Sequence, residues 1–109
     1  KMSESSPHVL EQQNGVKFSI DQGSAIYAPF DGTVSHVPPY YDYVQINTTD
    51  EFGAEYSVKI YNISYKDLLV NYLSKVKAGD LIAKAGTEDI LVEYTMNGEY
   101  IDPMICFLS

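Results

Sequence analysis

Short stretches in which apolar and polar residues alternate run along most of the chain. Such stretches, bounded by turn-forming residues, predict β-strands at Val16–Ile20, Ala25–Ala28, Thr33–Val37, Tyr43–Asn47, Glu55–Ile63, Leu81–Ala85 and Ile90–Met96. The dipeptides Asp31-Gly32 and Asn97-Gly98 suit turns that need a positive φ, and Gly79 marks a chain reversal before Leu81. The pattern therefore predicts an all-β fold, a compact antiparallel sandwich or barrel-like domain.

One segment departs from this pattern. Leu68, Leu69, Tyr72 and Leu73 fall at helical spacing, which predicts a short helix near residues 66–74. A loop packed over one end of the sheet is the alternative for this segment.

The first residues of the chain have a different composition. Residues 1–13 are rich in Ser, Glu and Gln, which predicts a flexible N-terminal tail or linker. Residues 14–109 are then one domain, because a chain of 109 residues has no room for a second core. The single cysteine, Cys106, excludes an internal disulfide.

Charge and apolar run length exclude two classes of partner. Fifteen acidic residues against seven basic ones give a net charge of -8, which disfavours binding to nucleic acid and to anionic surfaces. The apolar runs are shorter than the roughly 20 residues of a membrane span, so we expect no membrane insertion by this domain.

Tyrosine is unusually frequent, with ten residues against four Phe and no Trp. The segment PPYYDY, residues Pro38–Tyr43, predicts a stiff, exposed loop, and Tyr40, Tyr41 and Tyr43 are candidate partner-binding residues. A loop whose rings merely cover the sheet edge is the alternative.

Motifs of reactive sites are missing from the sequence. It has no Gly-x-Ser-x-Gly, no Gly-x-Gly-x-x-Gly, no phosphate-binding loop and no Cys-x-x-Cys. The two histidines, His8 and His36, do not form a paired-histidine site. We predict no catalytic residues, no bound metal and no cofactor.

Four segments, in order, resemble the lysostaphin-like (LytM) zinc endopeptidases, which cut peptidoglycan cross-bridges. The segments are GSAIYAPFDGTV (Gly23 to Val34), IYNIS (Ile60 to Ser64), VKAGDLIAKAG (Val76 to Gly86) and DILVEYTMNGEYIDP (Asp89 to Pro103). The resemblance implies a fold of the duplicated hybrid motif type.

The family's ligand positions are changed in this chain. The resemblance places its zinc ligands at Gln13, Lys17 and Leu91, and its catalytic histidines at Asn62 and Asp89. An amide is a weak donor, an ammonium repels a cation and an isobutyl group has no lone pair, so these residues predict a degenerate domain without zinc.

A domain of this kind is expected to act by binding. Inactive members of the family bind partner proteins in the bacterial envelope, and some animal relatives are secreted. The resemblance therefore implies a protein-binding, scaffolding or regulatory module in an extracytoplasmic place, whether periplasmic, cell-surface or secreted. A protein partner is expected, and peptidoglycan or peptide in the old groove is a second candidate ligand.

Two other families share part of the pattern. GSAIYAPFDGTV also resembles the glucose-type phosphocarrier domain of the sugar phosphotransferase system, but its phosphoryl-accepting histidine is missing from YSVKIYNIS. A biotinyl or lipoyl carrier shares APFDGTV and VKAGDLIA, but no lysine lies in the required turn.

Overall fold

The computed structural model describes residues 2–3, 8–12 and 15–104. Its strands are β1 (His8–Gln12), β2 (Val16–Ser19), β3 (Ala25–Tyr27), β4 (Gly32–His36), β5 (Tyr43–Thr49), β6 (Glu55–Tyr61), β7 (Lys75–Val76), β8 (Leu81–Lys84), β9 (Ile90–Met96) and β10 (Glu99–Ile101). The predicted all-β fold is confirmed, and every strand pair in it is antiparallel.

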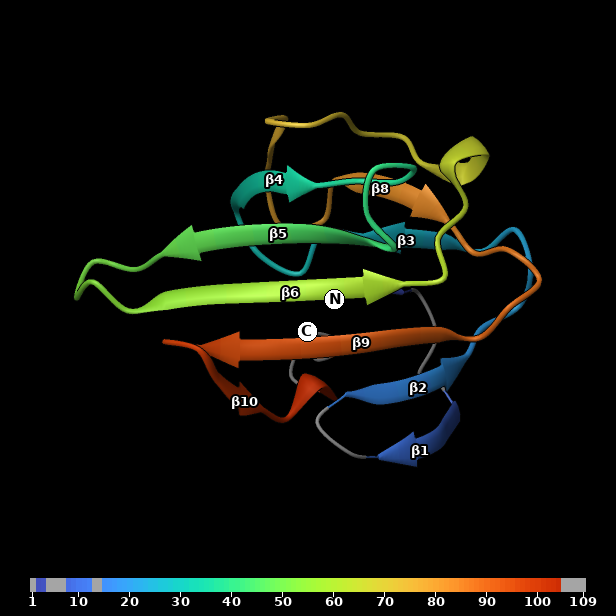
Figure 1. Ribbon diagram of the computed structural model, residues 1–109, viewed down its shortest axis with the longest axis horizontal. Helices are drawn as coiled ribbons and strands as arrows, with labels where there is room; N and C mark the ends of the chain where they lie inside the picture. Colours follow the sequence, from blue (N-terminus) through green and yellow to red (C-terminus); the bar gives the residue numbers. More distant parts are fainter. Residues whose placement is uncertain (1, 4–7, 13–14, 105–109) are drawn as a thin grey trace.

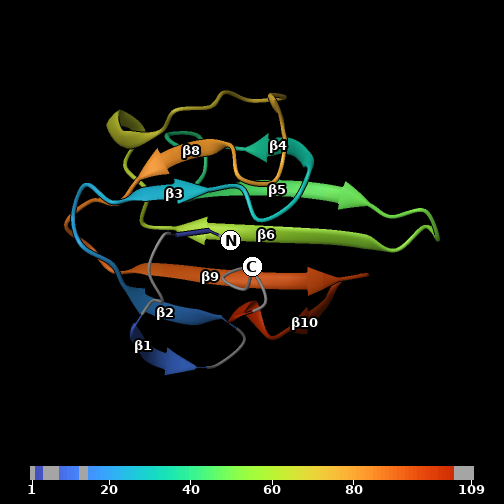
Figure 2. The ribbon, with the colours of Figure 1, turned by 180° about the vertical axis from the view of Figure 1, so that it is seen from behind.

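The strands form one large sheet and one small one (Figure 1). The large sheet has the order β1-β2-β9-β6-β5-β4-β7, with β10 paired to β9, and the small sheet is β3-β8. Figure 2 shows β3 and β8 in front of the large sheet, on the face that is turned away in Figure 1. The opposite face of the large sheet, turned to the viewer in Figure 1, is called the open face below.

Alternation along the central strands separates the core from the open face. On β9, Ile90, Val92 and Tyr94 are buried, whereas Leu91 and Glu93 between them are half-buried. Side chains of successive strand residues point to opposite faces, so the buried set packs toward β3 and β8. The fully buried side chains include Phe18, Ile26, Val34, Ile46, Val58, Ile60 and Ile82.

The segment expected to be a flexible tail is partly ordered. Within residues 1–13, β1 pairs with β2, Met2 is fully buried, and its carbonyl accepts a hydrogen bond of 2.7 Å from the Tyr27 N–H. Here the structure differs from the expectation. The edge of β2 offers backbone donors and acceptors, which a polar segment satisfies as well as an apolar one.

The helix expected near residues 66–74 is reduced to one turn. A 3-10 helix covers Tyr65–Asp67, and the chain continues as a loop in which Leu69, Tyr72 and Leu73 are exposed. The loop alternative is therefore the one that forms. Leu68 pairs with Ala83 in an isolated bridge, a contact that competes with the helical backbone pattern.

The two predicted dipeptide turns, Asp31-Gly32 and Asn97-Gly98, differ in the reason for their glycine. Asn97 and Gly98 have φ values of 51° and 85°, so the expected positive-φ hairpin turn is confirmed. Gly32 does not have a positive φ, and that expectation is wrong. A Cβ at Gly32 would instead collide with the carbonyl oxygen of Asn47 on the paired strand, so a close backbone approach requires glycine there.

No helix in residues 2–3, 8–12 and 15–104 is long and apolar enough to cross a bilayer.

Candidate functional site

Two of the three predicted metal positions are neighbours in the large sheet. Lys17 on β2 and Leu91 on β9 are directly paired, and Tyr61 on β6 pairs with Leu91 from the other side. All three side chains are half-buried. Gln13, the third metal position, lies outside the described residues.

The two predicted degenerate catalytic positions touch each other. Asn62 directly follows β6 and has a φ of 70°, a conformation that asparagine tolerates better than most residues. Its Nδ2 donates a 2.7 Å hydrogen bond to the backbone carbonyl of Asp89, just before β9. The amide therefore links the ends of two neighbouring strands.

These positions border a common cavity of about 310 Å³, lined by Lys17, Asn62, Thr87, Glu88 and Asp89. The fold thus brings Lys17, Asn62 and Asp89 to one cavity. These three residues come from separate parts of the chain.

Lys17 and Leu91, at two of the predicted metal positions, do not fit a zinc ion. Zinc sites use nitrogen, sulfur or carboxylate donors from three or four residues. Leu91 has no lone pair, and the ammonium of Lys17 would repel a dication. Within the described part of the chain, no three His, Cys, Asp or Glu residues form a group that could hold a metal.

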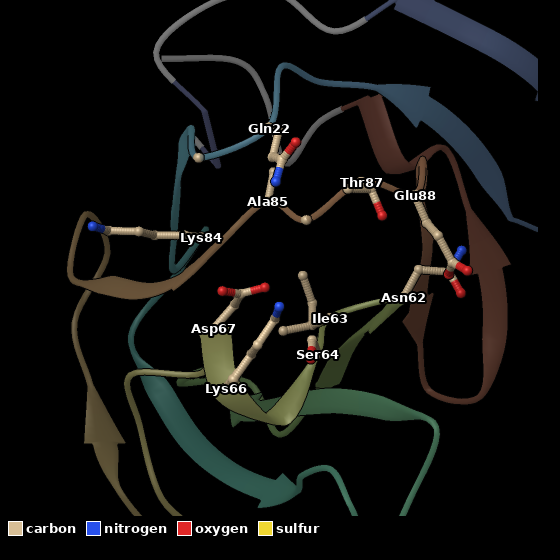
Figure 3. A pocket seen from close by; sticks show the side chains of 12 residues that line it. Gln22, Asn62, Ile63, Ser64, Lys66, Asp67, Lys84, Ala85, Thr87 and Glu88 are labelled. Carbon is tan, nitrogen blue, oxygen red and sulfur yellow. The ribbon is translucent and has the colours of Figure 1, made fainter.

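A larger cavity of about 490 Å³ lies beside Asn62, and sequence reasoning missed it. Figure 3 shows Lys66 and Asp67, from the 3-10 helix, on one side and Thr87 and Glu88, from the loop before β9, on another. Side chains of both charges line it, so it can accept both donors and acceptors. No local signal marks it, because its walls come from three distant segments.

The predicted tyrosine loop joins residues that the sequence did not single out. His36 lies 4.4 Å from Tyr41 and 5.5 Å from Tyr43, and Tyr43 lies 5.2 Å from Tyr61, measured between ring centroids. Tyr40 differs from these residues in its exposure, because 84% of its surface is accessible to solvent. Neither His36 nor Tyr61 carries a local signal, because strand pairing places them beside the loop.

A hydrogen-bond network on the open face supports His36. Asn47 Nδ2 donates to Ser35 Oγ at 2.7 Å, while Asn47 Oδ1 accepts from Gln45 Nε2 at 2.8 Å and from Ser57 Oγ at 2.7 Å. Ser35 Oγ is in turn 2.7 Å from His36 Nδ1. The imidazole ring is thereby tied to three strands.

The hydroxyl of Tyr61 holds its proton more strongly than an ordinary tyrosine. Burial, followed by the negative charge of Glu93 and a hydrogen bond with it, raises the pKa of Tyr61 to about 12. Loss of the proton would place two negative charges together in a partly desolvated place. Tyr61 therefore remains a neutral hydroxyl at physiological pH.

Comparison with known proteins identifies the family. Residues 11–103 match Peptidase family M23, so the chain belongs to this family. The match agrees with the predicted lysostaphin-like resemblance rather than with a phosphocarrier or a biotinyl carrier. No curated protein matches the chain in sequence.

Several solved structures share the fold. The catalytic domain of the antimicrobial peptidase lysostaphin from Staphylococcus simulans is 21% identical, with a TM-score of 0.63 over 85% of this chain and 77% of that one. A zinc containing peptidase from Vibrio cholerae is 19% identical, with a TM-score of 0.62 over 94% of this chain and 35% of that one. A structure of lysostaphin beyond its catalytic domain is covered only to 42%. The chain thus spans less than half of these longer proteins.

Proposed function

We propose that this chain is a non-catalytic M23 domain that acts by binding a protein partner. The observation that carries the proposal is the pair Lys17 and Leu91, side by side on β2 and β9 at the positions where the family resemblance places metal ligands. A cation and an aliphatic group there leave no ligand set for a Lewis acid or an activated water. The scaffold around them is otherwise complete.

Features of the open face support binding as the remaining activity. Tyr41 is 47% exposed and belongs to a cluster of rings, and tyrosine is enriched at recognition surfaces because it offers a large rigid area and a polar hydroxyl. Peptidoglycan or peptide is the second candidate ligand, with the cavities beside Asn62 as its site.

The proposed place of action is outside the cytoplasm, in the cell envelope or beyond it. Membership of a peptidase family with lysostaphin among its structural neighbours supports this. The net charge of -8 supports a partner other than nucleic acid.

A zinc titration tests the loss of the metal site. In calorimetry with ZnCl₂, the chelator-treated protein should show no binding at micromolar or tighter affinity. In a parallel assay with zinc present, it should not hydrolyse a pentaglycine peptide. Stoichiometric zinc binding in that range, or cleavage of the peptide, would overturn the proposal.

A matched variant checks that the assay can detect the metal. The triple variant Gln13→His, Lys17→Asp and Leu91→His restores nitrogen and carboxylate donors at the three positions, and we expect it to gain zinc binding at one ion per chain. If this folded variant binds no more zinc than the parent, these positions are not the family's ligand positions.

A further inference from the structure

Four aromatic rings form a continuous surface on the open face. His36 from β4, Tyr41 from the β4–β5 loop, Tyr43 from β5 and Tyr61 from β6 have consecutive ring centroids 4.4 to 5.8 Å apart. We call this set the tyrosine–histidine surface. In Figure 1 the β4–β5 loop passes in front of β8 and joins the start of β5, on the side turned to the viewer.

The rings are held in place before any ligand arrives. Tyr43 and Tyr61 are directly paired across β5 and β6, and Ser35 holds the His36 ring through Nδ1. Side chains already fixed in one position lose little conformational entropy on binding. The surface is therefore preorganised for an extended partner.

The inclination of the rings selects the kind of partner. The ring planes meet at 74° for His36 and Tyr41, 44° for Tyr41 and Tyr43, and 54° for Tyr43 and Tyr61. A sugar ring stacks its apolar face on one aromatic ring, so an extended oligosaccharide needs successive aromatic rings of similar orientation, which this surface does not offer. Proline rings instead fit between inclined aromatic side chains, as in the aromatic-lined sites that bind polyproline II segments.

A polyproline II segment also matches the hydroxyl groups. Its backbone carbonyls have no internal partners, so tyrosine hydroxyls other than that of Tyr61, which already bonds to Glu93, can donate to them. The segment is extended in solution before it binds, which lowers the entropy cost of association.

Charge determines what should flank the prolines. Asp42 is exposed between Tyr41 and Tyr43, and the whole chain has a net charge of -8. Lys59 Nζ lies 4.9 Å from the centroid of the Tyr43 ring, so that face already holds a cation, and the 47% exposed ring of Tyr41 is the one that can take a basic residue of the partner. Arginine or lysine beside the prolines would be attracted by the negative charge of this chain and by an aromatic face.

We infer that the tyrosine–histidine surface binds a proline-rich segment flanked by basic residues. This inference rests on the proposed function and specifies its protein partner by chemistry.

The test uses defined peptides and the described chain. About ten prolines extend about 30 Å as polyproline II, comparable with the 28 Å middle dimension of the domain. A fluorescent peptide of this length with arginine pairs at both ends is titrated and followed by polarisation. We expect saturable binding that weakens with salt. A glycine-serine peptide with the same arginines should bind at least about 10-fold more weakly.

Variants assign the binding to the rings. Tyr41→Ala should weaken binding of the proline peptide by about 10-fold or more, since hot-spot aromatics carry such energies. Tyr72→Ala removes a tyrosine that is 63% exposed on a different loop and should leave the affinity unchanged. Tyr41→Phe keeps the ring and should lose less than Tyr41→Ala.

Specified outcomes would overturn the inference. These are no saturable binding of the proline peptide, equal binding of the glycine-serine peptide, equal losses in Tyr41→Ala and Tyr72→Ala, or binding of a neutral hexasaccharide in place of the peptide. The zinc and pentaglycine assays, run on the same preparation, keep the two failures apart. A chain that is inert toward zinc but ignores the proline peptide refutes only the inference, whereas a chain that cleaves pentaglycine refutes the proposed function.

Discussion

Replacement of Asn47 by alanine tests the network on the open face. The Asn47 amide makes three side-chain hydrogen bonds, to Ser35, Gln45 and Ser57, at 2.7 to 2.8 Å. All of these groups are half-buried, so water can satisfy part of what the substitution removes. Each bond should therefore be counted near the lower end of the usual range, about 0.7 kcal/mol.

The sum predicts a loss of about 2 kcal/mol in the free energy of unfolding. For a chain of 109 residues, an unfolding entropy of about 2.1 cal/mol/K per residue converts this loss into a fall in Tm of about 9 °C. Thermal unfolding followed by circular dichroism measures it, with urea denaturation as the independent check. Asn47→Asp keeps both acceptor functions but cannot donate to Ser35, so it should lose only about 1 kcal/mol.

Thr49→Ala is the control, because Thr49 lies at the exposed end of the same strand, outside the network that Asn47 joins. We expect it to cost about 0.5 kcal/mol or less. If Asn47→Ala costs no more than Thr49→Ala, water replaces the network fully and it does not stabilise the sheet.

Three further sets of substitutions test other parts of the structure. Gly32→Ala should lose about 2 kcal/mol of stability by urea denaturation, because the new Cβ would collide with the backbone of Asn47. Gly86→Ala should be near neutral, because its Cβ would make only an ordinary contact of 3.5 Å with Asp67. The raised pKa of Tyr61 gives a stabilisation of the fold that is complete below pH 10 and is lost as pH rises toward about 12. The loss of stability at alkaline pH should therefore be smaller in Tyr61→Phe. Glu93→Gln should lower the pKa of Tyr61, measured in a tyrosinate absorbance titration. A stability that is equally pH-dependent in Tyr61→Phe would contradict this. Asn62→Ala should lower the free energy of unfolding by about 2 kcal/mol. Asn62→Gly should lower it less, because glycine accepts the φ of 70° without strain. Equal losses in the two variants would show that backbone strain is unimportant at this position.

Local pattern predicted most of the strands. The expected stretches from Val16 to Met96 agree with β2, β3, β4, β5, β6, β8 and β9 to within two residues at each end. Alternation over five to seven residues is a local property, so it needs no knowledge of the partner strand. The strands β1 and β7 were missed because they are short or polar, and pairing with a neighbour creates them.

The candidate site, like the strands, could be predicted only in part from the sequence. The correspondence of Lys17, Asn62, Asp89 and Leu91 to a family pattern could be predicted from order and spacing along the chain. The structure shows which of them are neighbours, through the pairing of Lys17 with Leu91 and the bond from Asn62 to Asp89. The cavity walls beside them could not be predicted, because they come from segments that share no local pattern.

The sequence by itself determined the strand-forming stretches, the family pattern and the residue types at the predicted ligand positions, because each depends on neighbours along the chain. Only the tertiary structure decided which rings meet. His36 and Tyr61 join Tyr41 and Tyr43 through cross-strand register, and Asn47 links Ser35 to Ser57 across strands β4, β5 and β6. Register is set by packing of the whole sheet, so no single stretch of sequence contains it.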